Sequence, residues 1–309
     1  MRCGCGTRRL PFLGVSLFLF YSPLLYAQSS DNSPNCPLTP GQQALLRHLS
    51  HQDERPRVVI DAVSFEGEIS LPEEQRQELA AEIRNEELFA GTDWEGRAET
   101  LAKVVWENQG FFTASVHATS QPLRRDGSEF HYNLNLKIEE GARYYLKAIR
   151  LENANPEVRT LTFPPEQLRQ LIPIQDGDLF APGKIRAGLG ALRNLYAQHG
   201  YIEFTAQLIT DVDREHRLVS VTVQLDKQVQ YRIGGIYTLG ADPQMEALLH
   251  SSFIPGEIFN NQVLTDFFKA NELRLPPDVA RQRVAFDRDP ILRTVTLRID
   301  LRPCPDPEF

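Results

Sequence analysis

The chain has 309 residues, of which 41% are hydrophobic and 24% charged, so it can bury a sizeable core and is not a disordered chain. Its 41 acidic residues against 33 basic ones give a net charge of -8. This balance argues against nucleic acid as a partner, because phosphates require clustered Lys and Arg, and against docking on anionic headgroups by charge alone.

Residues 1–27 have the three-part layout of a secretory signal peptide. The basic pair Arg8-Arg9 precedes an apolar stretch from Leu10 to Leu25, and small Ala27 stands before a polar segment. The alternative is an uncleaved membrane anchor, but the apolar stretch is short for a span. We therefore predict that the chain is secreted and that this segment is cleaved. Residues 28–56, rich in Ser, Asn, Pro and Gln, are predicted to be a flexible tail.

Two cysteines, Cys36 and Cys304, remain outside the predicted signal peptide. An oxidising compartment permits a disulfide between them. Two free thiols and an intermolecular bridge stay open as alternatives. Their redox state is not fixed by the sequence.

Residues 57–141 carry the first of three similar patterns. A strand with Val59, Val63 and Phe65 is followed by a predicted helix from Pro72 to Arg84. The second predicted helix has apolar residues at spacings of four, three and four, and ends at a glycine before an aromatic residue; these are Trp94, Ala98, Leu101, Val105 and Gly110-Phe111. Strands Phe111–Thr119 and Phe130–Ile138 then form a predicted antiparallel hairpin.

Residues 142–228 repeat this order. A strand with Ile149 and Leu151 precedes predicted helices at Pro165–Ile172 and along the stripe Ile185, Leu189, Leu192 and Tyr196. Gly200-Tyr201 ends the second helix, and a strand from Tyr201 to Thr210 leads into the alternating run Val219–Leu225.

Residues 229–303 are a degenerate third copy, and 304–309 are a short tail. Ile233 and Ile236 mark its first strand, a helix is predicted near Asn261–Ala270, and Val295–Leu301 alternates as a strand. Val63, Ile149 and Ile236 lie 86 and 87 residues apart, and Leu88-Phe89, Leu179-Phe180 and Ile258-Phe259 recur at matching places. The sequence therefore predicts an α+β protein made of a tandem array of three βααββ modules.

This pattern resembles the POTRA domain, with the second copy matching best. The residues that carry the resemblance are Tyr145–Ile149, Gly177–Phe180 and Tyr196–Tyr201. POTRA domains form periplasmic arms of outer-membrane assembly factors and two-partner secretion pores, where they bind unfolded barrel proteins, partner subunits or secreted clients. Those proteins continue into a barrel, whereas this sequence stops at Phe309. The resemblance thus implies binding without pore activity, and it leaves open whether the chain is complete or a barrel protein's arm cut short.

The resemblance also implies that the first strand of each hairpin is a sheet edge. An exposed edge can accept an extended client as an added strand, which is β-augmentation. The candidate partner-binding residues are Tyr201, Glu203, Thr205, Gln207, Phe111 and Thr113. The alternative is that a neighbouring module covers this edge.

We predict no enzyme activity, no cofactor and no metal. The tail residues His48 and His51 near Cys36 lack a fourth ligand, and the Asp211–Glu215 loop lacks the glycine and distal Glu of a calcium loop. The leading hypothesis is a periplasmic protein-binding module for outer-membrane protein assembly or secretion. Its partners would be unfolded outer-membrane or secreted proteins or a barrel assembly component, with no nucleic acid and only indirect membrane association. The alternatives are an envelope scaffold with one fixed partner and an unrecognised secreted enzyme.

Overall fold

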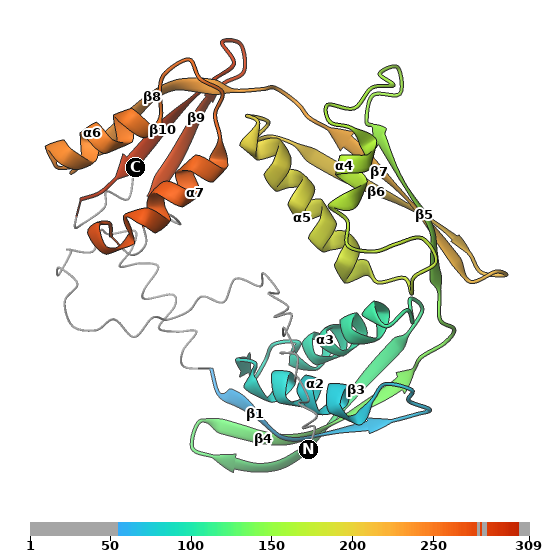
Figure 1. Ribbon diagram of the computed structural model, residues 1–309. Coiled ribbons are helices and arrows are strands. Elements are labelled where there is room, and N and C mark those ends of the chain that lie inside the picture. The colour runs from blue at the N-terminus through green and yellow to red at the C-terminus, as the bar shows by residue number, and fades with distance from the viewer. Residues whose placement is uncertain (1–54, 277–278, 280–282, 303–309) are drawn as a thin grey trace, which may run out of the picture. The chain divides into compact units, whose positions relative to one another are not determined.

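The computed structural model describes residues 55–276, 279 and 283–302, which form three small sheets, each from its own stretch of the chain (Figure 1). The predicted signal peptide, most of the predicted tail, Cys36 and Cys304 lie outside the described residues. The predicted α+β fold of three successive βααββ modules is confirmed. In the described part of the chain, none of the helices is both long and apolar enough to span a membrane.

The first module has one more strand than the predicted pattern. Its elements are β1 (Arg57–Glu66), α2 (Glu73–Asn85), β2 (Leu88–Phe89), α3 (Trp94–Asn108), β3 (Ser115–Asp126) and β4 (Glu129–Glu139). The sheet order is β2-β1-β4-β3, with β4 parallel to β1 and antiparallel to β3. The predicted hairpin therefore forms, and its first strand occupies one edge of the sheet.

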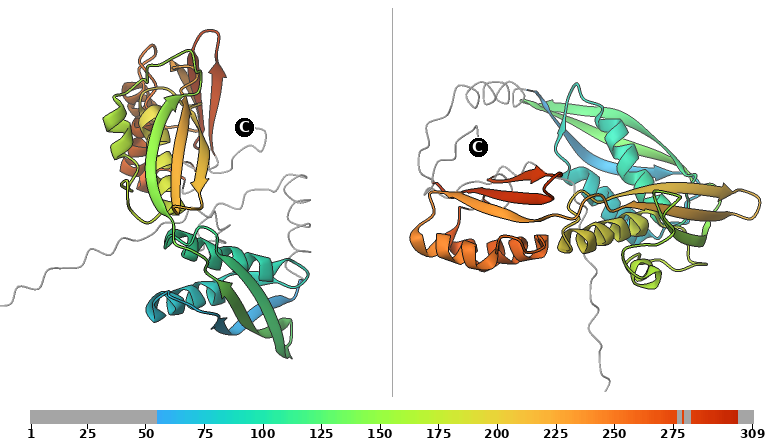
Figure 2. Two further views of the ribbon diagram at one scale, coloured as in Figure 1. Left: turned by 90° about the vertical axis from the view of Figure 1, so that its right-hand side faces the viewer. Right: turned by 90° about the horizontal axis from the view of Figure 1, so that it is seen from above.

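The second and third modules share one topology. The second contains β5 (Tyr145–Asn153), α4 (Pro165–Gln170), α5 (Pro182–Gln198), β6 (Thr205–Asp213) and β7 (Leu218–Asp226), in the order β5-β7-β6. The third contains β8 (Arg232–Leu239), α6 (Pro243–Ser252), α7 (Asn261–Ala270), the 3₁₀ turn Glu272–Arg274, β9 (Val284–Asp289) and β10 (Thr294–Asp300), in the order β8-β10-β9. Figure 2 shows the two helices of the third module on one face of its sheet.

Each module buries its own core between the sheet and the helices. The alternation that predicted the central strands is explained by burial: Val219, Val221, Val223 and Leu225 of β7 are all at most 2% exposed. Full burial of such a side chain stabilises the fold by about 1.5–3 kcal/mol. Each of the three cores contains large aromatic side chains, among them Trp106, Tyr196 and Phe259.

The dipeptide of Leu or Ile followed by Phe, which recurs before the second helix of each module, has a structural explanation. In the first module it is β2, which pairs antiparallel with the start of β1. In the other two modules Leu179 and Ile258 form single bridges with Tyr145 and Arg232 at the start of the first strand. This dipeptide therefore extends each sheet beside its first strand, at the edge opposite the hairpin.

Hydrogen bonds link consecutive modules at the glycine–aromatic steps. Gly110 and Gly200 have φ of +88° and +82°, which ends α3 and α5. Their carbonyls accept from Tyr144 N–H at 2.8 Å and Tyr231 N–H at 2.9 Å, at the entry to the next module. We call these two places the joints.

Apolar side chains reinforce both joints. Phe112 follows the first step and packs with the second module's core, edge-on to Phe180 with ring centroids 5.2 Å apart. Ile202, at the equivalent position after the second step, packs with the third module's core. Asn108 Oδ1 also accepts from Gly183 N–H at 2.8 Å, so a side chain of the first module caps a helix of the second.

Two predicted strands begin later than their sequence suggests. Phe111 and Tyr201 start turns, because Ala114 N–H donates to the Phe111 carbonyl and Phe204 N–H to the Tyr201 carbonyl. The strands start only at Ser115 and Thr205. The prediction that they begin at Phe111 and Tyr201 is therefore wrong by four residues.

Candidate functional site

The first strand of each hairpin lies at a sheet edge, as the resemblance implied. These three edge strands are β3, β6 and β9, and they differ in how readily another strand could pair with them. A usable edge needs a run of backbone groups in register that is free of proline, bulges and repelling charges. The three can therefore be ranked on their own residues.

The edge strand of the first module is obstructed from Pro122 onward, while in its first half Ala118 N–H already donates to Glu99 Oε1 at 2.7 Å. Pro122 cannot donate a hydrogen bond, and the register with β4 shifts between Pro122 and Arg124, which leaves Leu123 as an extra, bulged residue. Arg124 and Arg125 follow directly and add like charges along the strand. β3 therefore carries the features by which natural edges avoid pairing.

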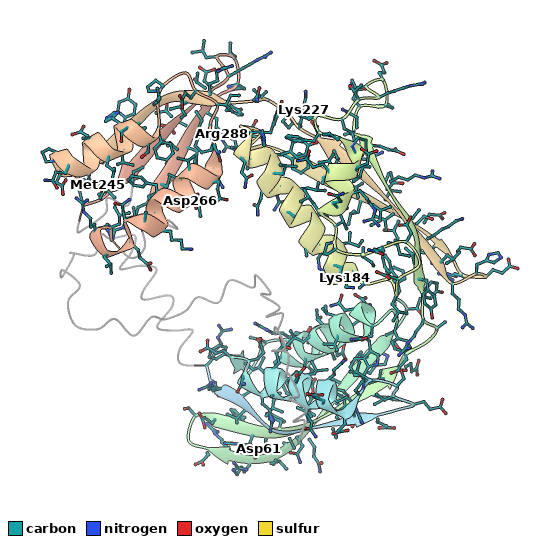
Figure 3. All side chains as sticks on the ribbon, in the orientation of Figure 1. Asp61, Lys184, Lys227, Met245, Asp266 and Arg288 are labelled. Atoms are coloured by element: carbon teal, nitrogen blue, oxygen red, sulfur yellow. The ribbon has the colours of Figure 1, made fainter. Side chains whose placement is uncertain are left out.

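The edge strand of the third module is short and charged. β9 has six residues and ends in Asp287, Arg288 and Asp289. Arg288, labelled in Figure 3, pairs with Glu203 at 3.4 Å, and Asp287 pairs with Arg298 at 2.9 Å. Two of the three charged residues at the end of β9 are thus engaged in ion pairs.

The edge strand of the second module is open. All nine residues of β6 pair continuously with β7, from Thr205 opposite Asp226 to Asp213 opposite Leu218. Residues 207–211 are all exposed, and Leu208 and Ile209 are 42% and 51% exposed. A neighbouring module therefore does not cover the middle of this edge.

The two exposed aliphatic residues lie on opposite faces of the sheet. Leu208 stands opposite buried Val223, so it lies on the face that carries the core. Ile209 stands opposite Thr222, on the face without helices. A strand added beside β6 would thus meet an apolar side chain above and below its backbone.

An acidic turn closes the far end of β6. Asp213 accepts hydrogen bonds from His216 N–H at 2.9 Å and from the His216 ring at 2.8 Å. The backbone N–H of His216 is the main reason why the pKa of Asp213 is lowered below its ordinary value of 3.8. The carboxylate therefore serves the hairpin turn, which explains the Asp211–Glu215 loop without a cation.

A second polar cluster, on the first module's sheet, is structural. Asp61, labelled in Figure 3, lies 2.7 Å from His131 Nδ1 and 2.6 Å from Arg124 Nη1. The hydrogen bond with His131 is the largest cause of the lowered pKa of Asp61. Register shifts occur on both sides of His131, at Asp61 in β1 and at Leu123 in β3. The cluster therefore joins the two bulged strands across β4.

The predicted site residues separate into two groups. Tyr201 and Phe111 are buried, at 9% and 5% exposure, and precede the strands. Glu203 accepts from the Tyr231 hydroxyl at 2.8 Å at the second joint, and Thr113 is exposed in the turn before β3. Thr205 and Gln207 lie on β6 and are exposed, so partner contact there stays a prediction.

Sequence reasoning missed Leu208 and Ile209, the most exposed apolar residues of the edge. A signal was present, because two adjacent aliphatic residues break the alternation expected of a half-buried strand. In the described ranges, no group of three His, Cys, Asp or Glu side chains is arranged to hold a metal ion. The candidate set His48, His51 and Cys36 lies outside those ranges.

Comparisons with known proteins agree with this architecture. Three POTRA domains of BamA from Haemophilus influenzae, POTRA3-5, superpose with a TM-score of 0.54 at 16% identity, covering 80% of this chain and 96% of that one. At this identity the likeness establishes the fold alone, which is a tandem array of POTRA-like modules. Residues 144–228 match the sequence model of the POTRA family, described as a surface antigen variable number repeat. The second module thus carries the family's sequence pattern, and the resemblance drawn from the sequence is confirmed.

Two further solved structures match more weakly. POTRA1-3 of the periplasmic domain of Omp85 from Anabaena gives a TM-score of 0.32 at 16% identity, over 80% of this chain and 96% of that one. CdiB from Escherichia coli gives 0.25 at 15% identity, over 62% of this chain and 36% of that one. A comparison with curated protein sequences finds no match.

Proposed function

We propose that this chain is a periplasmic polypeptide-binding protein of outer-membrane protein assembly or secretion, and that β6 is where it takes up an extended client strand. The observation that supports this most directly is the contrast among the three edges. β6 alone of the three combines continuous pairing, a run of exposed residues and two exposed aliphatic side chains. The POTRA match over residues 144–228 covers this same module.

Backbone pairing explains how many different clients could bind. Each added hydrogen bond contributes about 0.5–1.5 kcal/mol net, while fixing each client residue costs about 1–2 kcal/mol of conformational entropy. Hydrogen bonds to the exposed stretch 207–211 therefore roughly balance the ordering of the client. Apolar contact with Leu208 and Ile209 then supplies the surplus, so binding should be weak and should favour clients with alternating apolar residues.

The deciding experiment is site-specific photo-crosslinking at Gln207 and Ile209 in the native envelope. The proposal expects capture of several outer-membrane or secreted proteins in their unfolded forms, or of a barrel assembly component. A single recurrent folded partner would support the envelope scaffold instead. Absence of any adduct from both positions would remove β6 as the site.

A charge on the edge gives a matched test with purified protein. Ile209→Lys places a charge on the open edge, where it should oppose strand addition. We expect at least a fivefold loss of affinity for an outer-membrane protein diluted from urea, measured by anisotropy. Leu123→Lys is the control, because Leu123 is 45% exposed on the already obstructed β3. Equal losses in both variants would show that the effect is not specific to β6.

A further inference from the structure

The hairpin turns of the second and third modules share the same backbone conformation and hydrogen-bond pattern. In each turn an aspartate accepts a 2.9 Å hydrogen bond from the backbone N–H of the residue three positions later. Asp213 Oδ1 accepts from His216 N–H, and Asp289 Oδ1 accepts from Leu292 N–H. The turns end at Arg217 and Arg293, whose φ values are 55° and 56°. Each of these arginine carbonyls accepts a 2.9 Å hydrogen bond from the first strand of its module. The two turns can therefore be compared position by position.

The side chains at the tips differ in chemistry. The second module has Glu215 and His216 where the third has Ile291 and Leu292. Ile291 and Leu292 are 90% and 71% exposed, so they contribute little to the core. The polar pair shows that the turn itself does not require apolar residues. Two adjacent aliphatic side chains at the tip of a fixed hairpin thus need an explanation outside this module's own folding.

The charges around this tip favour an anionic partner. Arg293 in the turn and Arg232 on the adjacent strand β8 are exposed. Arg232 Nη1 donates to the Gly256 carbonyl at 2.8 Å, which leaves its other N–H groups as donors at this end of the sheet. Asp287 is paired with Arg298, and Asp289 accepts hydrogen bonds from the turn. A net charge of -8 argues against docking on anionic headgroups by charge alone. At this turn an apolar pair stands beside exposed arginines, which is the combination found in segments that insert at a membrane interface.

We propose that the β9–β10 turn inserts Ile291 and Leu292 into the headgroup layer of a bilayer containing anionic phospholipid, with Arg232 and Arg293 at the phosphates. A hairpin tip fits lipid better than a protein surface, because two side chains bury far less than the roughly 1,200 Å² of a stable protein interface. Arginine can reach phosphates while its carbon chain stays in the apolar layer. This direct contact departs from the indirect membrane association expected from the sequence, and it does not depend on strand addition at β6.

The second module provides the variant for the test. Ile291→Glu with Leu292→His copies the Glu215-His216 tip into a turn of the same geometry, so the fold and thermal midpoint should not change. The probe is co-sedimentation of the purified chain with vesicles of phosphatidylethanolamine and phosphatidylglycerol in physiological salt. We expect the wild type to bind, and the double variant to lose at least about tenfold in partition coefficient.

A charge variant and three results that would contradict the proposal complete the test. Arg293→Glu should also weaken binding to these vesicles, and should matter little on vesicles of phosphatidylcholine alone. Failure of the wild type to bind, or equal binding by the Ile291→Glu, Leu292→His variant, would overturn the proposal. So would a photo-crosslinker at position 291 that forms adducts in the native envelope with one protein and none with lipid.

Discussion

Replacing Gly200 by alanine should weaken the second joint by an amount that the structure sets. At φ +82° a Cβ costs about 1–2 kcal/mol of backbone strain. That Cβ would also lie 2.7 Å from the carbonyl oxygen of Tyr231, the residue whose N–H bonds to Gly200. Because this neighbour is backbone, the contact can be relieved only by shifting the joint, at about 1–3 kcal/mol.

Gly177→Ala is the matched control within the same module. Gly177 has φ +90°, so it carries similar strain, but nothing lies within 4 Å of the position of its Cβ. Reduced freedom of the unfolded chain offsets about 0.4–1 kcal/mol in both variants. The difference between the two variants, about 1–3 kcal/mol, therefore isolates the contact between modules.

The readout should report on the joint itself. Both tryptophans, Trp94 and Trp106, belong to the first module, so their fluorescence does not report on this position. Hydrogen exchange of the Tyr231 amide does, because that N–H donates to the Gly200 carbonyl at 2.9 Å. We expect exchange about 5- to 150-fold faster in Gly200→Ala than in Gly177→Ala. Equal exchange in the two variants would refute the joint as described.

Two further predictions concern a helix cap and a pH response. Asn108→Ala removes the acceptor for Gly183 N–H at the start of α5 and should cost about 1 kcal/mol in urea unfolding followed by circular dichroism, whereas Asn108→Asp, which keeps an acceptor, should cost less. Because the pKa of Asp213 is lowered in the fold, its stabilisation of the β6–β7 turn is full above the ordinary value of 3.8 and is lost as pH falls through the lowered pKa. Exchange of the His216 amide, corrected for intrinsic rates, should therefore accelerate at low pH in the wild type and be insensitive to this titration in Asp213→Asn.

The sequence predicted the modules well because their signals are local. Alternation in Val219–Leu225 and helical spacing in Ile185–Tyr196 each reflect one buried face, which a short window of residues records. The helix Asn261–Ala270 was predicted with the bounds it has in the structure. The strand β9 was not identified, because six residues ending in three charges have too little alternation to stand out.

The candidate site was predicted only in part. The sheet edge came from the resemblance, and Thr205 and Gln207 lie on it. Tyr201 and Glu203 were assigned to the same strand, but a turn after Gly200 directs Tyr201 into the core and leaves Glu203 at the second joint. The strand therefore starts four residues later than predicted, because the turn that follows Gly200 occupies residues 201–204.

Composition and periodicity determined that this chain repeats one α+β module three times, since each element leaves its apolar pattern in consecutive residues. The tertiary structure decided which of the three hairpin edge strands is open, and that Phe112 and Ile202 pack into the module that follows their own. It also showed that the apolar tip Ile291-Leu292 occupies the same turn as Glu215-His216. These facts depend on which distant backbone and side-chain groups meet, and a repeat pattern does not encode such pairings.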